Sequence, residues 1–167
     1  MAADRFAWAL ETLAIQPSDQ LLEIGCGHGL MVGPVCDALG RGRLLAIDRS
    51  KTMIAAASKR NRAALASGKV EFRAVALADA DFGRRRFTRI FAINVNLFWL
   101  DPALELALIR KILRPGGTLY LFFQPPTEVK AREVAARLQD TLKEHRFAVR
   151  HMAFSPPALF CAMASPA

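Results

Sequence analysis

The sequence has few cysteines, and none of them stands in a pattern that would form a metal site or a disulfide framework. Cys26, Cys36 and Cys161 are scattered, without a CxxC pair or a spacing typical of metal ligands. An odd number of isolated cysteines is typical of a protein whose thiols stay reduced. We therefore expect no metal ion and a cytoplasmic location.

Long apolar runs are also absent. No stretch approaches the roughly 20 apolar residues that span a bilayer, and Asn94 and Asn96 interrupt the most hydrophobic segment. The first residues lack the basic and apolar regions of a signal peptide. These features predict a protein with no membrane partner.

Repeats, low-complexity tracts and linkers are missing too, so we expect a single domain over residues 1–167. Hydrophobic residues make up 53% of the chain and charged residues 23%, a globular composition. The net charge is +8, and the densest basic cluster is Arg84-Arg85-Arg86 followed by Arg89. Because no aromatic platform accompanies these arginines, we favour a solvated basic surface and keep nucleic acid as the less favoured partner.

Short apolar runs alternate with segments of helical periodicity, which predicts a parallel α/β sheet. Strands are expected at 21–24, 44–47, 70–75, 89–94, 118–123, 147–154 and 159–163, and helices at 4–14, 30–39, 50–65, 101–114 and from 127 onward. Ser50, Asp101 and Thr127 are predicted N-caps. The last two strands are joined by so short a link that they must pair antiparallel.

The segment Glu23-x-Gly25-x-Gly27-x-Gly29 follows the first strand and opens a helix. Glycine lets a backbone turn sharply and approach a ligand closely, and a helix N-terminus favours an anionic group. The spacing differs from the dinucleotide fingerprint, because Leu30 stands where its third glycine would fall. A nicotinamide-dependent oxidoreductase is therefore disfavoured.

Two further residues suit an adenosyl ligand. Asp48 ends the second strand, where a carboxylate can accept hydrogen bonds from both ribose hydroxyls. Met53 lies one helical turn after Ser50 and is expected to pack on an adenine face, with ordinary core packing as the alternative.

Three stretches together resemble class I methyltransferases that use S-adenosylmethionine, in their small-molecule branch. They are residues 21–29, residues 46–50 with Met53, and Leu113-Arg114-Pro115-Gly116-Gly117. The resemblance implies a three-layer α/β fold whose seven-stranded, mostly parallel sheet has the order 3-2-1-4-5-7-6, with an antiparallel C-terminal hairpin. It also implies S-adenosylmethionine as cofactor and methyl transfer to O, N, S or C of a small metabolite.

The resemblance further implies cofactor contacts from the glycine loop and from the ends of the strands. These residues are Glu23, Gly25, Cys26, Gly27, Gly29, Asp48, Arg49, Met53, Ala76, Leu77 and Asn94. Many family members carry an acidic residue after strand three that meets the adenine amino group; this chain has Ala76-Leu77-Ala78, with Asp79 as a candidate substitute. Thr88 also stands where many members have Asp.

The methyl acceptor is expected over the carboxyl ends of strands four and five. Asn96 and Gln124 would orient a polar acceptor there, while Phe98 and Trp99 form an apolar wall or, alternatively, anchor the next helix in the core. His28, in the cofactor loop, is a further substrate candidate. No catalytic base is assigned, which is acceptable for an acceptor that is already ionised or a free amine.

The chain has no room for a separate cap domain. We therefore expect an open site, a site covered by an N-terminal helix within residues 1–18, or a site closed by a second subunit in a homodimer. Two other functions stay in view: a non-catalytic subunit that binds S-adenosylmethionine or acts as a scaffold, and an RNA methyltransferase.

Overall fold

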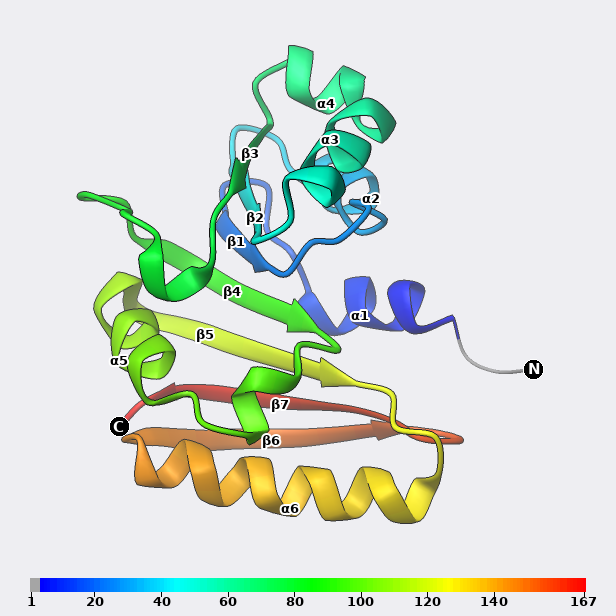
Figure 1. Cartoon of the computed structure of the whole chain (residues 1–167), viewed down its shortest axis with the longest axis vertical. Coiled ribbons are helices and arrows are strands. Elements are labelled where there is room, and N and C mark those ends of the chain that lie inside the picture. Colours follow the sequence, from blue (N-terminus) through cyan, green and yellow to red (C-terminus); the bar gives the residue numbers. More distant parts are fainter. Residues whose placement is uncertain (1–3) are drawn as a thin grey trace.

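A seven-stranded sheet forms the centre of the computed structural model, which describes residues 4–167 (Figure 1). The first three residues of the predicted N-terminal segment lie outside the described residues. The strands are β1 (Gln20–Ile24), β2 (Arg43–Asp48), β3 (Val70–Ala74), β4 (Phe87–Ile93), β5 (Leu113–Phe123), β6 (Phe147–Ser155) and β7 (Leu159–Pro166). Their order, β3-β2-β1-β4-β5-β7-β6, and the antiparallel pairing of β7 with β5 and β6 confirm the predicted fold.

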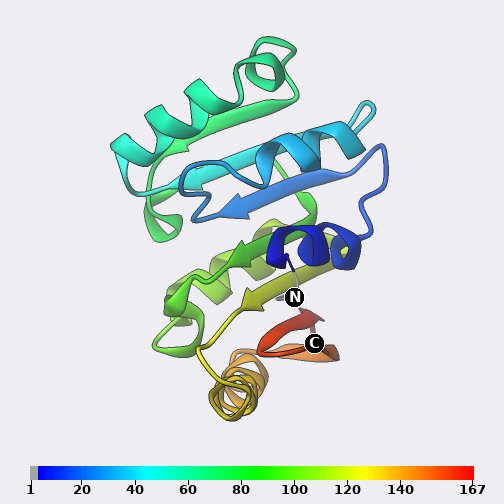
Figure 2. The same ribbon diagram turned by 90° about the vertical axis from the view of Figure 1, so that its right-hand side faces the viewer.

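Helices cover both faces of this sheet (Figures 1 and 2). They are α1 (Arg5–Leu13), α2 (Val32–Ala38), α3 (Lys51–Arg60), α4 (Arg62–Ala66), α5 (Ala103–Ile112) and α6 (Glu128–Glu144), with the short 3-10 helices η1 (Leu77–Asp79) and η2 (Asn96–Trp99). One apolar core joins the sheet to α1, α2 and α3, and the other joins it to α5 and α6. Along residues 4–167, no helix combines the length and apolarity needed to cross a membrane.

Two of the predicted helix caps are present. The Ser50 hydroxyl accepts a hydrogen bond from the Met53 N–H at 3.2 Å, and the Thr127 hydroxyl accepts one from the Lys130 N–H at 3.1 Å. The third predicted cap is wrong: α5 starts at Ala103, and Pro102 at its N-cap has no side-chain oxygen to replace that of Asp101.

Asn61 breaks the helix predicted over residues 50–65 into α3 and α4. Its backbone leaves the helical region, at φ −111° and ψ 37°. The buried side-chain amide donates hydrogen bonds to the carbonyl oxygens of Gly29, at 3.0 Å, and Ala57, at 2.9 Å. Asn side chains compete in this way with helical hydrogen bonding. The break therefore attaches the glycine loop to α3.

A buried polar network fixes α1 to the sheet. The Asp19 carboxylate, 5% exposed, accepts hydrogen bonds from the Thr88 hydroxyl at 2.8 Å and pairs with Arg89. The Arg89 guanidinium also donates to the carbonyl oxygens of Leu13, at 2.8 Å, and Ala14, at 3.1 Å. A cation at these carbonyls complements the negative end of the helix dipole. Many family members have Asp at the position of Thr88. In this chain the Asp19 carboxylate, bonded to the Thr88 hydroxyl, lies at that place.

We predict that Arg89→Met lowers the free energy of unfolding by about 2–4 kcal/mol, because it leaves the Asp19 carboxylate buried without its cation. Urea denaturation followed by circular dichroism measures the change. Arg86→Met, at an exposed arginine without an ion pair among the described residues, is the control and should stay within about 0.5 kcal/mol. Equal effects in the two variants would contradict the assigned role of Arg89.

Candidate active site

A cleft of about 630 Å³ opens where the parallel strands end. The carboxyl ends of parallel strands meet at one edge of a sheet, so the residues that follow β1, β2, β3 and β4 converge there. The volume lies in the range of small-molecule and cofactor sites, roughly 300–1,000 Å³. Its lining residues are Ile24, Gly25, Ile47, Asp48, Arg49, Val75, Ala76, Leu77, Ile93, Asn94, Val95, Asn96, Leu97, Leu100 and Glu105.

The wall nearest β1 is bare backbone from the glycine loop. Gly25 has φ +70°, and a Cβ on it would stand 2.7 Å from Val95 Cγ2. A side chain here would therefore fill the gap between the glycine loop and the segment after β4. The helix that follows begins at Val32 rather than at the predicted Leu30, because Gly29 is still left-handed, with φ +73°. The loop extends accordingly to Met31.

Asp48 holds this loop to the end of β2. One carboxylate oxygen accepts the Gly27 N–H at 3.0 Å, and the other accepts the Ser50 N–H at 2.9 Å. The carbonyl of Ile47 accepts two more N–H groups from the loop, those of Gly25 and Cys26. Each carboxylate oxygen can accept a second hydrogen bond. The half-buried Asp48 can thus hold the loop and still bind a ligand hydroxyl.

Glu23 lies beneath the loop as an acid without a counter-ion. Its side chain is buried, and Oε2 has no hydrogen-bond partner among residues 4–167. Burial, followed by repulsion from Asp48, raises the pKa of the Glu23 carboxyl from 4.5 to about 8. Glu23 is therefore mostly protonated at neutral pH, and a cation in the cleft would favour its ionised form.

Cys26 is unsuited to nucleophilic chemistry. Burial, with the charges of Glu23 and Asp48, raises the pKa of its thiol to about 12. A neutral thiol is a poor nucleophile. The cysteine therefore serves as a small packed residue in the glycine loop.

A second, narrow hollow lies beside the cleft, over the ends of β4 and β5. Asn94, with φ +56°, turns so that its side-chain oxygen accepts the Gln124 N–H at 2.8 Å. From α1, Arg5 donates to the Gln124 side-chain oxygen at 3.4 Å, and the Trp8 ring meets Phe122 edge-on at 5.8 Å. Helix α1 therefore reaches this part of the edge, and its Arg5 and Trp8 line the hollow together with Asn94 and Gln124.

The predicted cofactor residues divide into two groups. Those that line the cleft are Gly25, Asp48, Arg49, Ala76, Leu77 and Asn94. Those that lie near the cleft but do not line it are Glu23, Cys26, Gly27, Gly29 and Met53. Met53 is half-buried on α3, outside the cleft lining, which fits the alternative of ordinary packing.

Only Asn96 of the predicted substrate residues lines the cleft, and Gln124 lies in the neighbouring hollow. Phe98 is fully buried in the core, and Trp99 packs against α6 with Arg137 5.7 Å from its ring centre. Neither forms the predicted apolar wall; both anchor the segment after β4. His28 is exposed in a shallow hollow with Lys59 and Arg60, outside the cleft lining.

Sequence reasoning missed the side chains that do form the apolar wall. Leu97 and Leu100 flank Phe98 and Trp99 and face the cleft, and Glu105 adds a carboxylate from the first turn of α5. Leu97 and Leu100 could have been predicted, because they are apolar residues close to the polar end of a strand. Nothing in the spacing of Glu105 indicated that α5 turns it toward the cleft.

Comparison with known proteins agrees with this geometry. Residues 21–117 match the model of the "Methyltransferase domain" family. YrhH of Bacillus subtilis (strain 168), named as a candidate methyltransferase, is 29% identical over 131 residues, which cover 78% of this chain and 72% of YrhH. The chain covers only 32% and 37% of two other curated relatives. The chain belongs to the methyltransferase domain family.

Solved structures share the fold of this methyltransferase. A SAM-dependent methyltransferase from Aquifex aeolicus has a TM-score of 0.80 at 17% identity, over 95% of this chain and 88% of that one. The CcbJ methyltransferase from Streptomyces caelestis has a TM-score of 0.79 at 15% identity, over 100% and 97%. The class I fold and the methyltransferase class, both expected from the sequence, are thereby confirmed.

The raised pKa of Glu23 predicts how stability depends on pH. The folded state binds a proton at Glu23 that the unfolded state has lost between pH 4.5 and about 8. The stabilisation from this proton is full below pH 4.5 and is lost as the pH rises toward 8. The Glu23→Gln variant cannot lose a proton here, so its stability relative to the wild type should increase over that window, by on the order of 2–4 kcal/mol.

Denaturant unfolding of the unliganded protein from pH 4.5 to 8.5 measures this difference. Glu11→Gln, which removes an exposed carboxylate on α1, is the control and should show a flat difference. A flat difference for Glu23→Gln as well would mean that Glu23 titrates normally.

Proposed function

We propose that this enzyme methylates a small metabolite, with the methyl donor held in the 630 Å³ cleft and the acceptor over the ends of β4 and β5. The observation that carries the proposal is the bare glycine loop fixed by Asp48 at the cleft entrance. S-adenosylmethionine, when bound, supplies an electrophilic methyl group on a sulfonium. The protein residues bind and orient the two reactants.

The ribose fits beside Asp48. Its carboxylate lies at the end of β2, lines the cleft and keeps spare acceptor capacity on both oxygens. Gly25 leaves the backbone uncovered on the adjoining wall. Glu23 is buried below, and a cation bound nearby would favour the ionised form of its carboxyl group. These residues suit a ligand that is a cationic adenosyl compound.

The purine fits the apolar part of the cleft, between the loop after β3 and η2. Val75, Leu77, Leu97 and Leu100 line it from the two sides. Asp79 is exposed and does not line the cleft, whereas Glu105 does. Helix α5, which carries Glu105, packs against η1. We assign to Glu105 the hydrogen bond from the adenine amino group that family members make with an acid after β3.

We place the acceptor at the rim of the cleft beside the neighbouring hollow, which is closed to a molecule the size of water in this structure. Gln124 and Asn94 offer amide groups there, Trp8 and Arg5 of α1 border it, and Asn96 lies exposed at the cleft rim. Among the described residues, no histidine lines the cleft or this hollow. Methyl transfer then relies on in-line positioning of a free amine or an ionised acceptor.

We predict that Asp48→Asn weakens binding of S-adenosylhomocysteine about 10–100-fold, because one of two acceptor oxygens is replaced by a donor. Isothermal titration calorimetry measures the affinity. Asp79→Asn removes an exposed carboxylate outside the cleft and should bind within twofold of wild type. Unchanged affinity in Asp48→Asn would remove Asp48 from the donor site.

Once binding of the donor product has been measured, catalysis is tested with candidate acceptors. Formation of S-adenosylhomocysteine is measured with a panel of small amines, phenols, thiols and carboxylic acids. With the active acceptor, Gln124→Ala and Asn96→Ala should lower turnover while donor affinity stays the same. Donor binding without turnover on any acceptor of the panel would contradict the proposed substrate class.

The proposed hydrogen bond between Glu105 and the adenine amino group is tested with two ligands that differ only in that group. Glu105→Ala should weaken binding of S-adenosylhomocysteine about 5–20-fold through loss of one charge-assisted hydrogen bond. It should leave binding of S-inosylhomocysteine, which has no 6-amino group, nearly unchanged. If Glu105→Ala weakens both ligands equally, Glu105 acts on the shape of the cleft and not on the amino group.

A further inference from the structure

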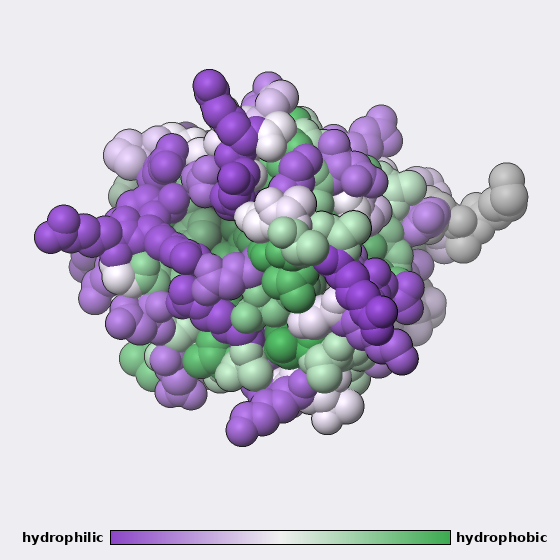
Figure 3. All heavy atoms as spheres, turned by 90° about the horizontal axis from the view of Figure 1, so that it is seen from above, coloured by the Kyte–Doolittle hydropathy of each residue, from purple (hydrophilic) through white to green (hydrophobic). Residues whose placement is uncertain are grey.

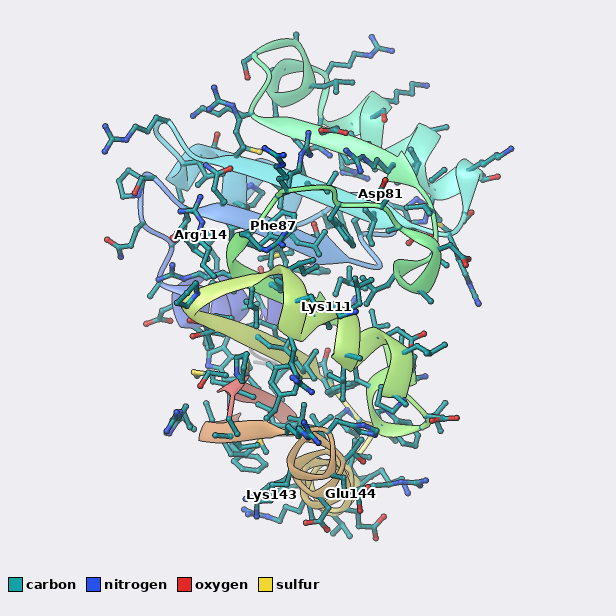
Figure 4. All side chains as sticks on the ribbon, turned by 90° about the vertical axis from the view of Figure 1, so that its left-hand side faces the viewer. Asp81, Phe87, Lys111, Arg114, Lys143 and Glu144 are labelled. Atoms are coloured by element: carbon teal, nitrogen blue, oxygen red, sulfur yellow. The ribbon has the colours of Figure 1, made fainter. Side chains whose placement is uncertain are left out.

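A second cavity, of about 700 Å³, lies at the opposite edge of the sheet, where the strands begin. The buried residues Leu21, Leu44, Leu45 and Phe87 lie beneath it. Its rim carries five arginines from the start of β2, the loop before β4 and the start of β5: Arg43, Arg84, Arg85, Arg86 and Arg114. Figure 4 shows Phe87 and Arg114 next to each other at this edge. We call this feature the basic cavity.

Positive charge in the basic cavity is largely uncompensated. Glu71 is the single carboxylate among its lining residues, and Arg73 and Arg85 both pair with it, each at 2.7 Å. Within residues 4–167, the other four rim arginines form no ion pair. Figure 3, which looks onto the β3 end of the sheet, shows long hydrophilic side chains projecting at the left, the side on which β4 and β5 begin in Figure 1. Like charges gathered in this way attract an anion.

Two of the guanidinium groups are held in place by backbone carbonyls. Arg43 donates to the carbonyl oxygens of Arg41 and Gly42, and Arg86 donates to those of Gly83 and Arg85. A guanidinium has five N–H donors, so each of the two keeps donors for a ligand. The rim is therefore partly ordered before anything binds.

We propose that the basic cavity binds a compact anion with two or more phosphate groups. Arginine forks match phosphate oxygens with pairs of hydrogen bonds, and several phosphates are needed to balance several arginines. Single-stranded nucleic acid fits less well, because it binds through exposed aromatic platforms. The one aromatic residue in the cavity lining, Phe87, is only 3% exposed.

The basic cavity is separate from the cleft proposed for the methyl donor. The five-residue strand β1 runs between the two edges, a length of roughly 17 Å at about 3.3 Å per residue. A ligand in the basic cavity therefore does not take the place of the donor or of the acceptor.

Calorimetric titration with inorganic tripolyphosphate at 150 mM NaCl tests the proposal. We expect one tripolyphosphate per chain, bound at least tenfold more tightly than orthophosphate. Arg84→Gln/Arg114→Gln should weaken this binding at least tenfold. The control Lys130→Gln/Lys143→Gln removes two positive charges from the exposed face of α6, outside the cavity lining, and should stay within twofold of wild type. Affinity for S-adenosylhomocysteine should be unchanged in both variants.

Arg84→Lys/Arg114→Lys keeps the charge but loses the fork, so it should bind tripolyphosphate with intermediate affinity. It also replaces the glutamine variant if that variant fails to fold. Three results would overturn the proposal: no binding of tripolyphosphate to the wild type, equal losses in the cavity variant and the α6 control, or tighter binding of an RNA duplex that the cavity variant abolishes. The last result would assign the surface to nucleic acid.

Discussion

The carboxylate of Asp48 accepts N–H groups from Gly27, after β1, and from Ser50, at the start of α3. Two backbone segments that follow different strands are thereby fixed to one side chain. This attachment, the Asn61 amide at Gly29 and the Ile47 carbonyl together hold the loop where a Cβ on Gly25 would stand 2.7 Å from Val95 Cγ2. The width of the cleft depends on these few hydrogen bonds, since backbone donors in a partly buried loop need acceptors.

Local features of this arrangement could be predicted from the sequence. Glycine spacing after an apolar run indicates a loop close to a ligand, the caps of α3 and α6 follow from single residues, and a short link requires the terminal hairpin. Contacts between distant segments could not be predicted. Asn61 reaches Gly29 across 32 residues, and the sequence offers no signal that a polar residue in a helical pattern will turn inward.

The segment after β4 shows why side-chain type alone misplaces a site. Phe98 and Trp99 are the largest side chains near the predicted acceptor, and large aromatic groups gain most from burial. In the structure, Phe98 is buried in the core and Trp99 packs against α6, which is consistent with the free energy that large aromatic side chains gain on burial. The smaller Leu97 and Leu100 are left to line the cleft. Because η2 is a tight 3-10 turn, neighbouring residues point to different sides, and a sequence pattern cannot assign those sides.

Charge is divided unequally between the two edges of the sheet. Asp48 and Glu105 line the cleft together with Arg49, and Glu23 lies beneath it, while five arginines gather where the strands begin. A chain of net charge +8 repels a cationic sulfonium on average. At physiological salt, screening acts over about 8 Å, which is shorter than the roughly 17 Å length of β1. A ligand at the cleft therefore responds mainly to the nearby carboxylates, and the proposed donor site can attract a cation although the protein as a whole is basic.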